Sequence, residues 1–144
     1  MTQVDFYILA EQSSGDRYTM ACRLAGKAWQ QGHRVYLHTN SDAESQHLDR
    51  LLWTFRQDSF IPHGLAAGAD PQLNPVLIGH QGEAGEEHDV LLNLAAEVPQ
   101  FFSRFQRVAE FIDHDAEIKQ GGRNRYSFYR DRGYPLNTHT IGGT

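Results

Sequence analysis

One stretch near the end of the chain gathers cationic and aromatic side chains that could bind an anion with an apolar end. Residues 119–132 hold five of the chain's 13 basic residues: Lys119, Arg123, Arg125, Arg130 and Arg132. On a helix, steps of four, three and four residues put four side chains on one face: Lys119, Arg123, Tyr126 and Arg130. Guanidinium groups offer forked donors to carboxylates, and the aromatic ring offers an apolar surface. From spacing alone, a solvated amphipathic helix with inward-facing aromatics is the commoner explanation.

Composition limits the partners that such a surface could have. The chain has 144 residues, which fits a single domain over residues 1–144. Its net charge of −5 argues against a broad nucleic-acid-binding surface, although a small basic patch could still bind a short acidic peptide. A single cysteine, Cys22, excludes an internal disulfide and a cysteine-based zinc site.

The chain carries no sign of a targeting or membrane segment. Its first residues lack a basic leader followed by an apolar run, and no stretch reaches the roughly 18–20 apolar residues that span a bilayer. We therefore expect a soluble protein of the cytoplasm, with its last few residues disordered.

The order of the predicted elements indicates an α/β domain with a mainly parallel sheet. Apolar runs predict strands at residues 4–9, 34–39, 76–78, 89–94 and 107–112. Helices are predicted from Tyr18 to Ala28, after a capping box at Ser41 and, as a short segment, from Pro99. Between the second helix and the strand at residues 76–78, residues 64–75 are predicted to be a loop.

The basic helix itself has a weak beginning in the sequence. Asp113 or Asp115 is predicted to cap it, which is a commoner role for the Asp113-His114-Asp115 triplet than acid–base chemistry. Gly121 and Gly122 each weaken a helix by about 1 kcal/mol relative to Ala, so a late start near Gly122 is also compatible with the sequence.

The residues needed for catalysis or cofactor binding are not found at the required spacings. The turn at residues 10–16 has one glycine and matches neither the dinucleotide fingerprint nor the phosphate loop. The eight histidines are scattered, and none lies three or four residues from another on one helix. Cys22 has no identifiable basic neighbour, and Ser13 and Ser14 lack the nucleophile-elbow pattern. We predict no catalytic residue, no cofactor and no metal.

Two aromatic residues are candidates for a second binding surface. Trp53 lies at the edge of the apolar stripe that includes Leu48 and Leu52, and Phe60 follows in an irregular Ser-Phe-Ile-Pro segment. Together on a rim they would suit a protein partner, while capping one end of the core is an equally common role.

Several segments, in the same order and nearly end to end, resemble one family of replication proteins. They are FYIL at residues 6–9, LAGKAWQQGHRVYLHT at 24–39, LDRLLWTFRQDSFIPHGLA at 48–66, PVLIG at 75–79, DVLLNL at 89–94, EFI at 110–112 and KQGGRNRYSFYRDRGYPLNTH at 119–139. The sequence is similar to the chi subunits of bacterial DNA polymerase III, which are accessory proteins of the clamp-loader complex. The tryptophan-to-histidine segment at residues 53–63 and the arginine-tyrosine helix are fairly specific in combination.

The resemblance implies a Rossmann-like three-layer fold that binds no nucleotide, no intrinsic enzymatic activity and two protein partners. One partner is the psi subunit, whose binding face in the family corresponds to Trp53 and Phe60. The other is the acidic C-terminal tail of the single-stranded-DNA-binding protein, bound by the basic helix and the turn after it. The matching positions are Ile112, Lys119, Arg123, Tyr126, Arg130, Leu136, Asn137 and Thr138.

Two other classes of function remain open at this stage. The basic helix could bind bare single-stranded nucleic acid directly, which predicts a salt dependence set by several phosphates. An enzyme with an unrecognised site on a nucleotide-type fold would be stabilised thermally by its ligand. The acidic net charge weakens the first alternative, and the missing phosphate loop weakens the second.

Overall fold

The protein alternates strands and helices along most of its length. The structure is a computed structural model that describes residues 1–54, 60–81 and 84–142. Its elements are β1 (Gln3–Leu9), α1 (Arg17–Gln30), β2 (Val35–His38), α2 (Asp42–Thr54), β3 (His63–Leu65), β4 (Val76–Gly79), β5 (Val90–Asn93), the 3-10 helix η1 (Phe102–Arg104), β6 (Arg107–Ile112), α3 (Ala116–Asp131) and β7 (Leu136–Ile141).

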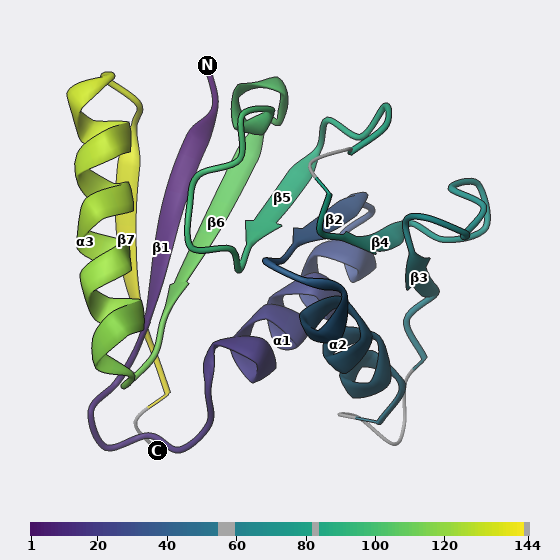
Figure 1. The fold of residues 1–144 in the computed structure, drawn as a ribbon, viewed down its shortest axis with the longest axis horizontal. Helices are drawn as coiled ribbons and strands as arrows, with labels where there is room; N and C mark the ends of the chain where they lie inside the picture. Colours follow the sequence, from purple (N-terminus) through teal and green to yellow (C-terminus); the bar gives the residue numbers. More distant parts are fainter. Residues whose placement is uncertain (55–59, 82–83, 143–144) are drawn as a thin grey trace.

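The strands form one sheet, as predicted for an α/β protein. Its seven strands lie in the order β3-β4-β2-β5-β6-β1-β7, and every described pair is parallel. In Figure 1 the β7 edge lies beside α3, and the β3 edge lies near the end of α2. The edge strands of the sheet are therefore β3 and β7, which are far apart in both sequence and space.

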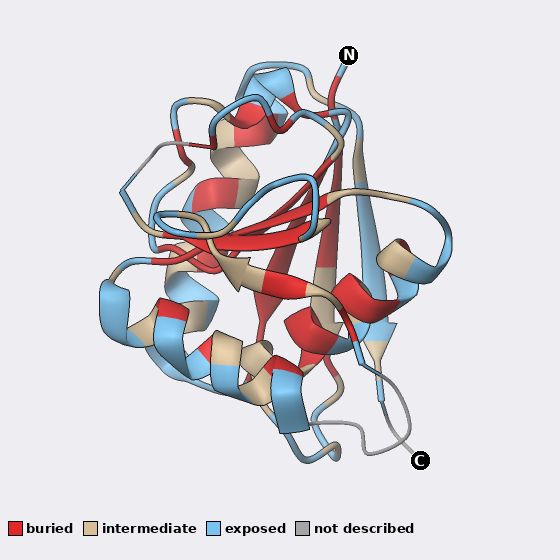
Figure 2. Ribbon diagram, turned by 90° about the vertical axis from the view of Figure 1, so that its right-hand side faces the viewer, coloured by how far each residue is buried: buried red, intermediate tan, exposed pale blue. Residues whose placement is uncertain are grey.

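Helices cover both faces of the sheet and complete a three-layer, Rossmann-like arrangement. One face packs against α1 and α2 through a cluster that includes Leu48, Leu52 and Ile78, and the other packs against η1 and α3. Figure 2 shows the buried sheet between helices whose outer faces are exposed. The strands β2, β4 and β5 are buried throughout, as expected for a parallel sheet covered on both sides.

Small side chains bring α1 close to the sheet. Ala21, Cys22 and Ala25 are fully buried on its inner face. Burial raises the pKa of the Cys22 thiol to about 12, which keeps the thiol protonated and unreactive. Cys22 is therefore a packing residue, as the sequence indicated.

Three local predictions were wrong. Residues 64–75 were expected to form a loop, yet His63–Leu65 pairs with β4 as the edge strand β3. The helix expected from Pro99 is only the one-turn η1. No strand was predicted after residues 107–112, yet Leu136, Asn137 and Thr138 begin the edge strand β7. The two strands form because each pairs with another strand of the sheet, β3 with β4 and β7 with β1.

Candidate protein-binding surfaces

The basic helix begins at Ala116, six residues before the late start that the paired glycines allowed. Asp115 is its N-cap, and its Oδ1 accepts hydrogen bonds from the backbone N–H groups of Glu117 at 2.8 Å and Ile118 at 3.2 Å. Glu117 adds a negative charge to the first turn, where it complements the helix dipole. Lys119 is therefore held in regular helix, with its N–H bonded to the carbonyl of Asp115 at 3.0 Å.

Gly122 allows the helix to lie close against the sheet. A Cβ atom at this position would be only 2.1 Å from Cδ1 of Ile112, the last residue of β6. A glycine that lowers helix propensity thus permits a close crossing that no other residue allows without repacking. The same crossing leaves Ile112 only 8% exposed, so little of this side chain is within reach of a partner.

Three cationic side chains of α3 are exposed: Lys119, Arg123 and Arg130. Lys119 has no ion-pair partner among the described residues, and Arg123 donates only to Oε1 of Gln120, at 3.3 Å. Arg130 differs, because its guanidinium lies 3.2 Å from the carboxylate of Asp131. The N-terminal half of this face therefore carries the less compensated positive charge.

Apolar residues border this charged face. Tyr126 is half-buried and meets the ring of Phe6 edge-on, with centroids 5.3 Å apart. Leu136 is also half-buried, whereas Asn137 and Thr138 are exposed on the edge strand. The groove described below is not lined by a residue of α3.

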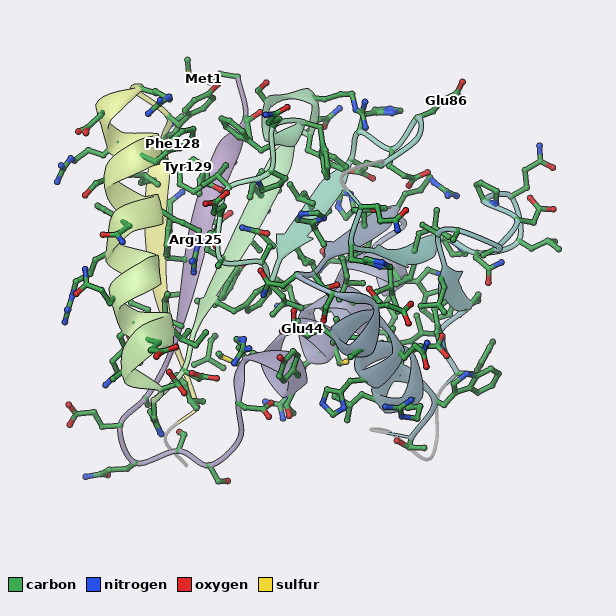
Figure 3. All side chains as sticks on the ribbon, in the orientation of Figure 1. Met1, Glu44, Glu86, Arg125, Phe128 and Tyr129 are labelled. Atoms are coloured by element: carbon green, nitrogen blue, oxygen red, sulfur yellow. The ribbon has the colours of Figure 1, made fainter. Side chains whose placement is uncertain are left out.

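Arg125, which the helical spacing did not place on the face of Lys119 and Arg123, faces the protein interior. Its Nε donates to Oε1 of Glu110 at 2.7 Å, and its Nη1 donates to the carbonyl of Ala96 at 2.9 Å. The other carboxylate oxygen of Glu110 accepts from Asn93 at 2.9 Å and from the Tyr129 hydroxyl at 2.7 Å. Figure 3 shows Arg125 and Tyr129 on the side of α3 that faces the sheet.

Burial controls the titration of this network. Burial raises the pKa of Glu110, and the Arg125 charge with the hydrogen bonds from Asn93 and Tyr129 offsets only part of that rise. Burial and the Glu110 carboxylate both raise the pKa of Tyr129. The signal for this site was available in the sequence, because Glu110 is the one charged residue within the otherwise apolar run at residues 108–112.

The two aromatic candidates meet at the opposite edge of the sheet. Trp53 is 58% exposed, Phe60 is 52% exposed, and their ring centroids are 4.9 Å apart. His63 lies beneath them, 5.2 Å from Trp53, and its ring is fixed by contacts with the carbonyl oxygens of Ile61 at 2.6 Å and Asp49 at 3.1 Å. The segment 55–59 between the two aromatics lies outside the described residues.

The start of α1 does not suit a phosphate, although this is where nucleotide-binding relatives of the fold hold one. The Asp16 carboxylate occupies the helix N-terminus and accepts from the N–H of Thr19 at 2.9 Å. The N–H of Arg17 donates to the carboxylate of Asp113 at 3.0 Å. The carboxylates of Asp16 and Asp113 thus occupy backbone N–H groups at the start of α1 that a bound phosphate would need.

The described residues also lack a metal-ligand cluster and a membrane-spanning segment. No group of three or more His, Cys, Asp or Glu side chains is placed to hold a metal ion in residues 1–54, 60–81 and 84–142. Within the same ranges, no helix combines the length and apolar character needed to cross a bilayer.

Comparison of the sequence with known proteins shows to which family this chain belongs. The family described as DNA polymerase III chi subunit, HolC, matches residues 1–137. The chain belongs to this family. It is 43% identical over 141 residues to DNA polymerase III subunit chi of Pseudomonas aeruginosa, with 98% of each chain covered. It is 32% identical to the Haemophilus influenzae subunit, covering 95% of this chain and 96% of the relative, and 30% identical to the Escherichia coli subunit, covering 97% and 99%.

Family membership confirms the resemblance found in the sequence. The family match extends from the N-terminus to the start of β7, and so covers nearly all of the sheet and all three α-helices. The two surfaces described above lie on the β7 side and the β3 side of this sheet.

Proposed function

We propose that this chain is a non-catalytic accessory subunit of DNA polymerase III, which bridges the psi subunit and the acidic tail of the single-stranded-DNA-binding protein. The observation that carries the proposal is the uncompensated positive charge of Lys119 and Arg123 on an exposed helix of an otherwise acidic family member. The protein would then act in the cytoplasm, at the replication machinery on the nucleoid.

The tail is recognised by charge and by one apolar contact in this proposal. Arg123 pairs with the terminal carboxylate or the last acidic side chain, because a guanidinium can form two parallel hydrogen bonds with a carboxylate. Lys119 and Arg130 flank the acidic run. Tyr126 receives the terminal aromatic side chain, while Ile112 contributes the small part of its surface that remains exposed.

The edge strand β7 contributes further residues to the proposed tail site. Leu136 extends the apolar border, and Asn137 and Thr138 offer polar groups on the exposed part of β7. Ionic contacts at such an exposed face are screened by salt, so each contact is of modest strength. Many tails displayed along coated DNA would raise the effective concentration and make a weak contact sufficient.

Psi is held by the aromatic surface at the other edge of the sheet. Trp53 and Phe60 expose two adjoining rings, and exposed aromatic residues of this kind dominate the binding energy of many interfaces. Because the two surfaces lie on different edges of the sheet, both partners can be bound at once.

The tail site is tested by calorimetric titration with a synthetic peptide that ends in several Asp residues, an apolar dipeptide and a free carboxylate. Arg123→Ala should weaken binding by about 10- to 100-fold, since a hydrogen bond to a charged group contributes about 1.5–3 kcal/mol. Arg50→Ala removes an exposed cation from α2 and should bind the peptide like wild type. Equal affinities for wild type and Arg123→Ala would remove Arg123 from the site.

The psi surface is tested by gel filtration of mixtures with psi. Phe60→Ala should abolish or strongly reduce co-elution, because it truncates one of the two exposed rings. Leu73→Ala truncates another exposed apolar side chain, which is 72% exposed in the loop before β4, and should leave the complex intact. Retained co-elution of the Phe60 variant would contradict the assignment.

A further inference from the structure

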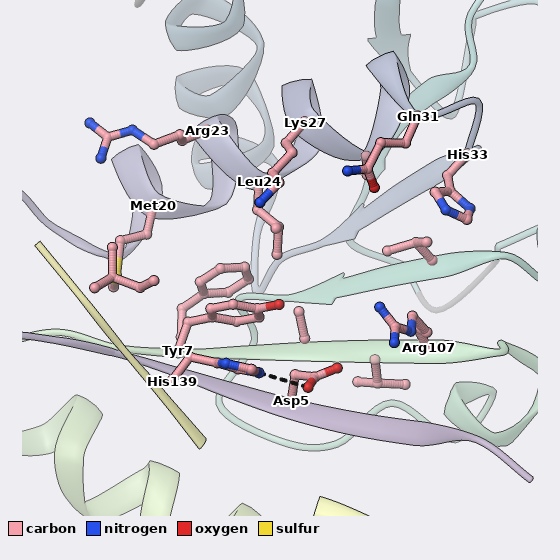
Figure 4. A pocket seen from close by; sticks show the side chains of 16 residues that line it. Asp5, Tyr7, Met20, Arg23, Leu24, Lys27, Gln31, His33, Arg107 and His139 are labelled. Carbon is pink, nitrogen blue, oxygen red and sulfur yellow. Dashed lines mark hydrogen bonds and ion pairs between the residues drawn. The ribbon is translucent and has the colours of Figure 1, made fainter. Parts of the chain in front are cut away.

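A groove of about 540 Å³ lies on the face of the sheet opposite α3, and neither proposed partner uses it. The groove exists because α1 packs over β2, β5 and β6, whereas β1 and β7 extend the sheet beyond the helix. Figure 4 shows α1 as one wall and the strands as the other. Its volume is in the range of roughly 300–1,000 Å³ that is typical of small-ligand sites.

Three rings form a ladder across the strand wall. His139, Tyr7 and Phe111 are register partners on β7, β1 and β6. The ring centroids of His139 and Tyr7 are 4.8 Å apart and those of Tyr7 and Phe111 are 5.8 Å apart, and both pairs are nearly parallel. Phe111 is buried, but the His139 side chain is 44% exposed on the edge strand. The ladder therefore ends in a partly open ring.

The plane of this last ring is fixed. Nε2 of His139 lies 2.9 Å from Oδ1 of Asp5, a contact drawn in Figure 4. Among the described residues, no ring other than Tyr7 stacks on His139. A flat aromatic ligand could extend the ladder by one member without any rearrangement of the strands.

Cations approach the ladder from both walls. Arg23 and Lys27 lie one turn apart on α1, and Arg107 begins β6. Lys27 extends from the helix toward the strands in Figure 4, with Arg107 on the opposite wall. Within the described part of the chain, none of the three forms an ion pair, and Arg107 donates only to Gln3, at 3.2 Å.

These cations differ from the arginines of the described residues that are paired with a carboxylate, of which Arg130 is one. Arg17, Arg34 and Arg125 each lie within 4 Å of a protein carboxylate. Among the residues that the structure describes, Asp5 is the only acidic one that lines the groove, and it is already in contact with His139. The groove thus carries an excess of positive charge in a chain whose net charge is −5.

We propose that this groove binds a short stretch of single-stranded DNA. One base stacks on His139, and the neighbouring phosphates lie between Lys27, Arg23 and Arg107. A parallel ring ladder flanked by cations is the combination that single-strand binders use, because every base has a π-face and every nucleotide has a phosphate. A duplex does not fit, since its bases are already stacked on one another.

An acidic peptide is the main competing ligand, and the ring ladder argues against it. A peptide carboxylate gains from the cations but makes no use of an open, fixed ring face at the end of a stack. The groove also lies on the opposite side of the sheet from α3, so strand binding here and tail binding there would be separate events.

The proposal is tested by fluorescence anisotropy of a labelled oligothymidylate with the purified full chain at low salt. We expect saturable binding that weakens with salt, with a slope of roughly −0.7 for each phosphate neutralised. Combined Lys27→Ala and Arg107→Ala substitutions should weaken binding at least about tenfold and reduce this slope. His139→Ala should weaken binding by roughly 5- to 100-fold through the lost stacking.

Matched variants separate this site from the surface of α3. Arg50→Ala, an exposed cation outside the groove, and Arg123→Ala should both bind the oligonucleotide like wild type. In the same titrations, the groove variants should retain binding of the acidic tail peptide. Because the two cations are at the surface, thermal unfolding of the cation variants should remain close to wild type. His139→Ala also removes the contact with Asp5, so its binding is measured well below its own unfolding transition.

Three results would overturn the proposal. One is the absence of saturable oligonucleotide binding at low salt. The second is binding that survives the groove substitutions and is lost with Lys119→Ala and Arg123→Ala, which would place nucleic acid on α3. The third is an acidic peptide whose binding depends on Lys27 and Arg107 while the oligonucleotide does not bind, which would make the groove a peptide site.

Discussion

Two glutamates of this protein have the same kinds of neighbour and opposite pKa shifts. Glu110, beneath α3, contacts Arg125 and the Tyr129 hydroxyl, and its side chain is fully buried. Glu44, at the start of α2, contacts Arg17 and the Tyr18 hydroxyl, and its side chain is 17% exposed.

The balance between burial and hydrogen bonding differs at the two sites. Burial raises the pKa of Glu110 more than its partners lower it. At Glu44, burial also raises the pKa, but the hydrogen bonds from Tyr18 and Asn40 and the Arg17 charge outweigh it, so the pKa lies below its usual value. The lesser burial of Glu44, together with its hydrogen bonds from the backbone and side chain of Asn40, accounts for the opposite direction of its pKa shift.

The difference matters because the two sites hold different parts of the molecule. The Glu110 network fixes α3, whose outer face carries Lys119 and Arg123. The Glu44 contacts join the first turns of α1 and α2 on the other face of the sheet. Loss of a partner should therefore cost more at Glu110, where water cannot replace it.

The largest expected effect is that of Arg125→Ala. It leaves the Glu110 carboxylate buried without its cation and should lower the free energy of unfolding by about 3–5 kcal/mol. The measurement is urea denaturation followed by circular dichroism. Arg123→Ala, two residues away and exposed, is the control and should change stability by less than about 0.5 kcal/mol.

A second variant shows whether the missing cation is the cause. Combining Arg125→Met with Glu110→Leu removes both charges and should recover much of the lost stability, because a buried pair can often be replaced by apolar residues. A loss below about 1 kcal/mol in Arg125→Ala would mean that water or movement of α3 compensates the carboxylate.

Arg17→Ala should have a smaller effect, of about 1–2 kcal/mol. Arg17 pairs with Glu44 at 3.3 Å and approaches Asp113 at 3.5 Å, but its side chain is 18% exposed and water can reach the carboxylates that it leaves. The same denaturation experiment applies, with Arg23→Ala on the next turn of α1 as the unpaired control. A loss as large as that of Arg125→Ala would contradict the role given to solvent access.

The smallest expected effect is a difference in pH dependence. A carboxyl whose pKa is raised in the folded state stabilises the fold below its unfolded pKa of about 4.3, and this contribution is lost as pH rises. A carboxyl whose pKa is lowered contributes above about pH 4.3, and its contribution is lost as pH falls through the folded pKa. Glu110 is of the first kind and Glu44 of the second.

Glutamine variants make this contrast measurable. We expect the stability advantage of wild type over Glu44→Gln to grow as pH rises from acid to neutral. The advantage over Glu110→Gln should shrink across the same range. Parallel pH profiles for the two variants would show that burial does not separate the two sites.

The sequence predicted the central part of the fold well and the edges poorly. The strands β1, β2, β4, β5 and β6 are apolar runs, because both of their faces are buried. The edge strand β7, with the sequence LNTHTI, is exposed over most of its length and lacks that signal. Only its register with β1 identifies it as a strand.

The candidate site was predicted in part. The spacing on α3 correctly put Lys119, Arg123 and Arg130 on an exposed face, and Trp53 and Phe60 lie together as two exposed rings. Spacing could not show that Arg125 pairs with Glu110, fifteen positions earlier in the chain. Nor could it show that Gly122 makes room for Ile112.

The sequence by itself determined the class of the fold, the family and the identity of the exposed charges. These depend on local patterns and on similarity to known sequences along the chain. Only the tertiary structure decided which arginine is buried, where the edge strands lie and that His139, Tyr7 and Phe111 form one ladder. Such features depend on the register of strands that are distant in the chain, and no periodicity within one segment records that register.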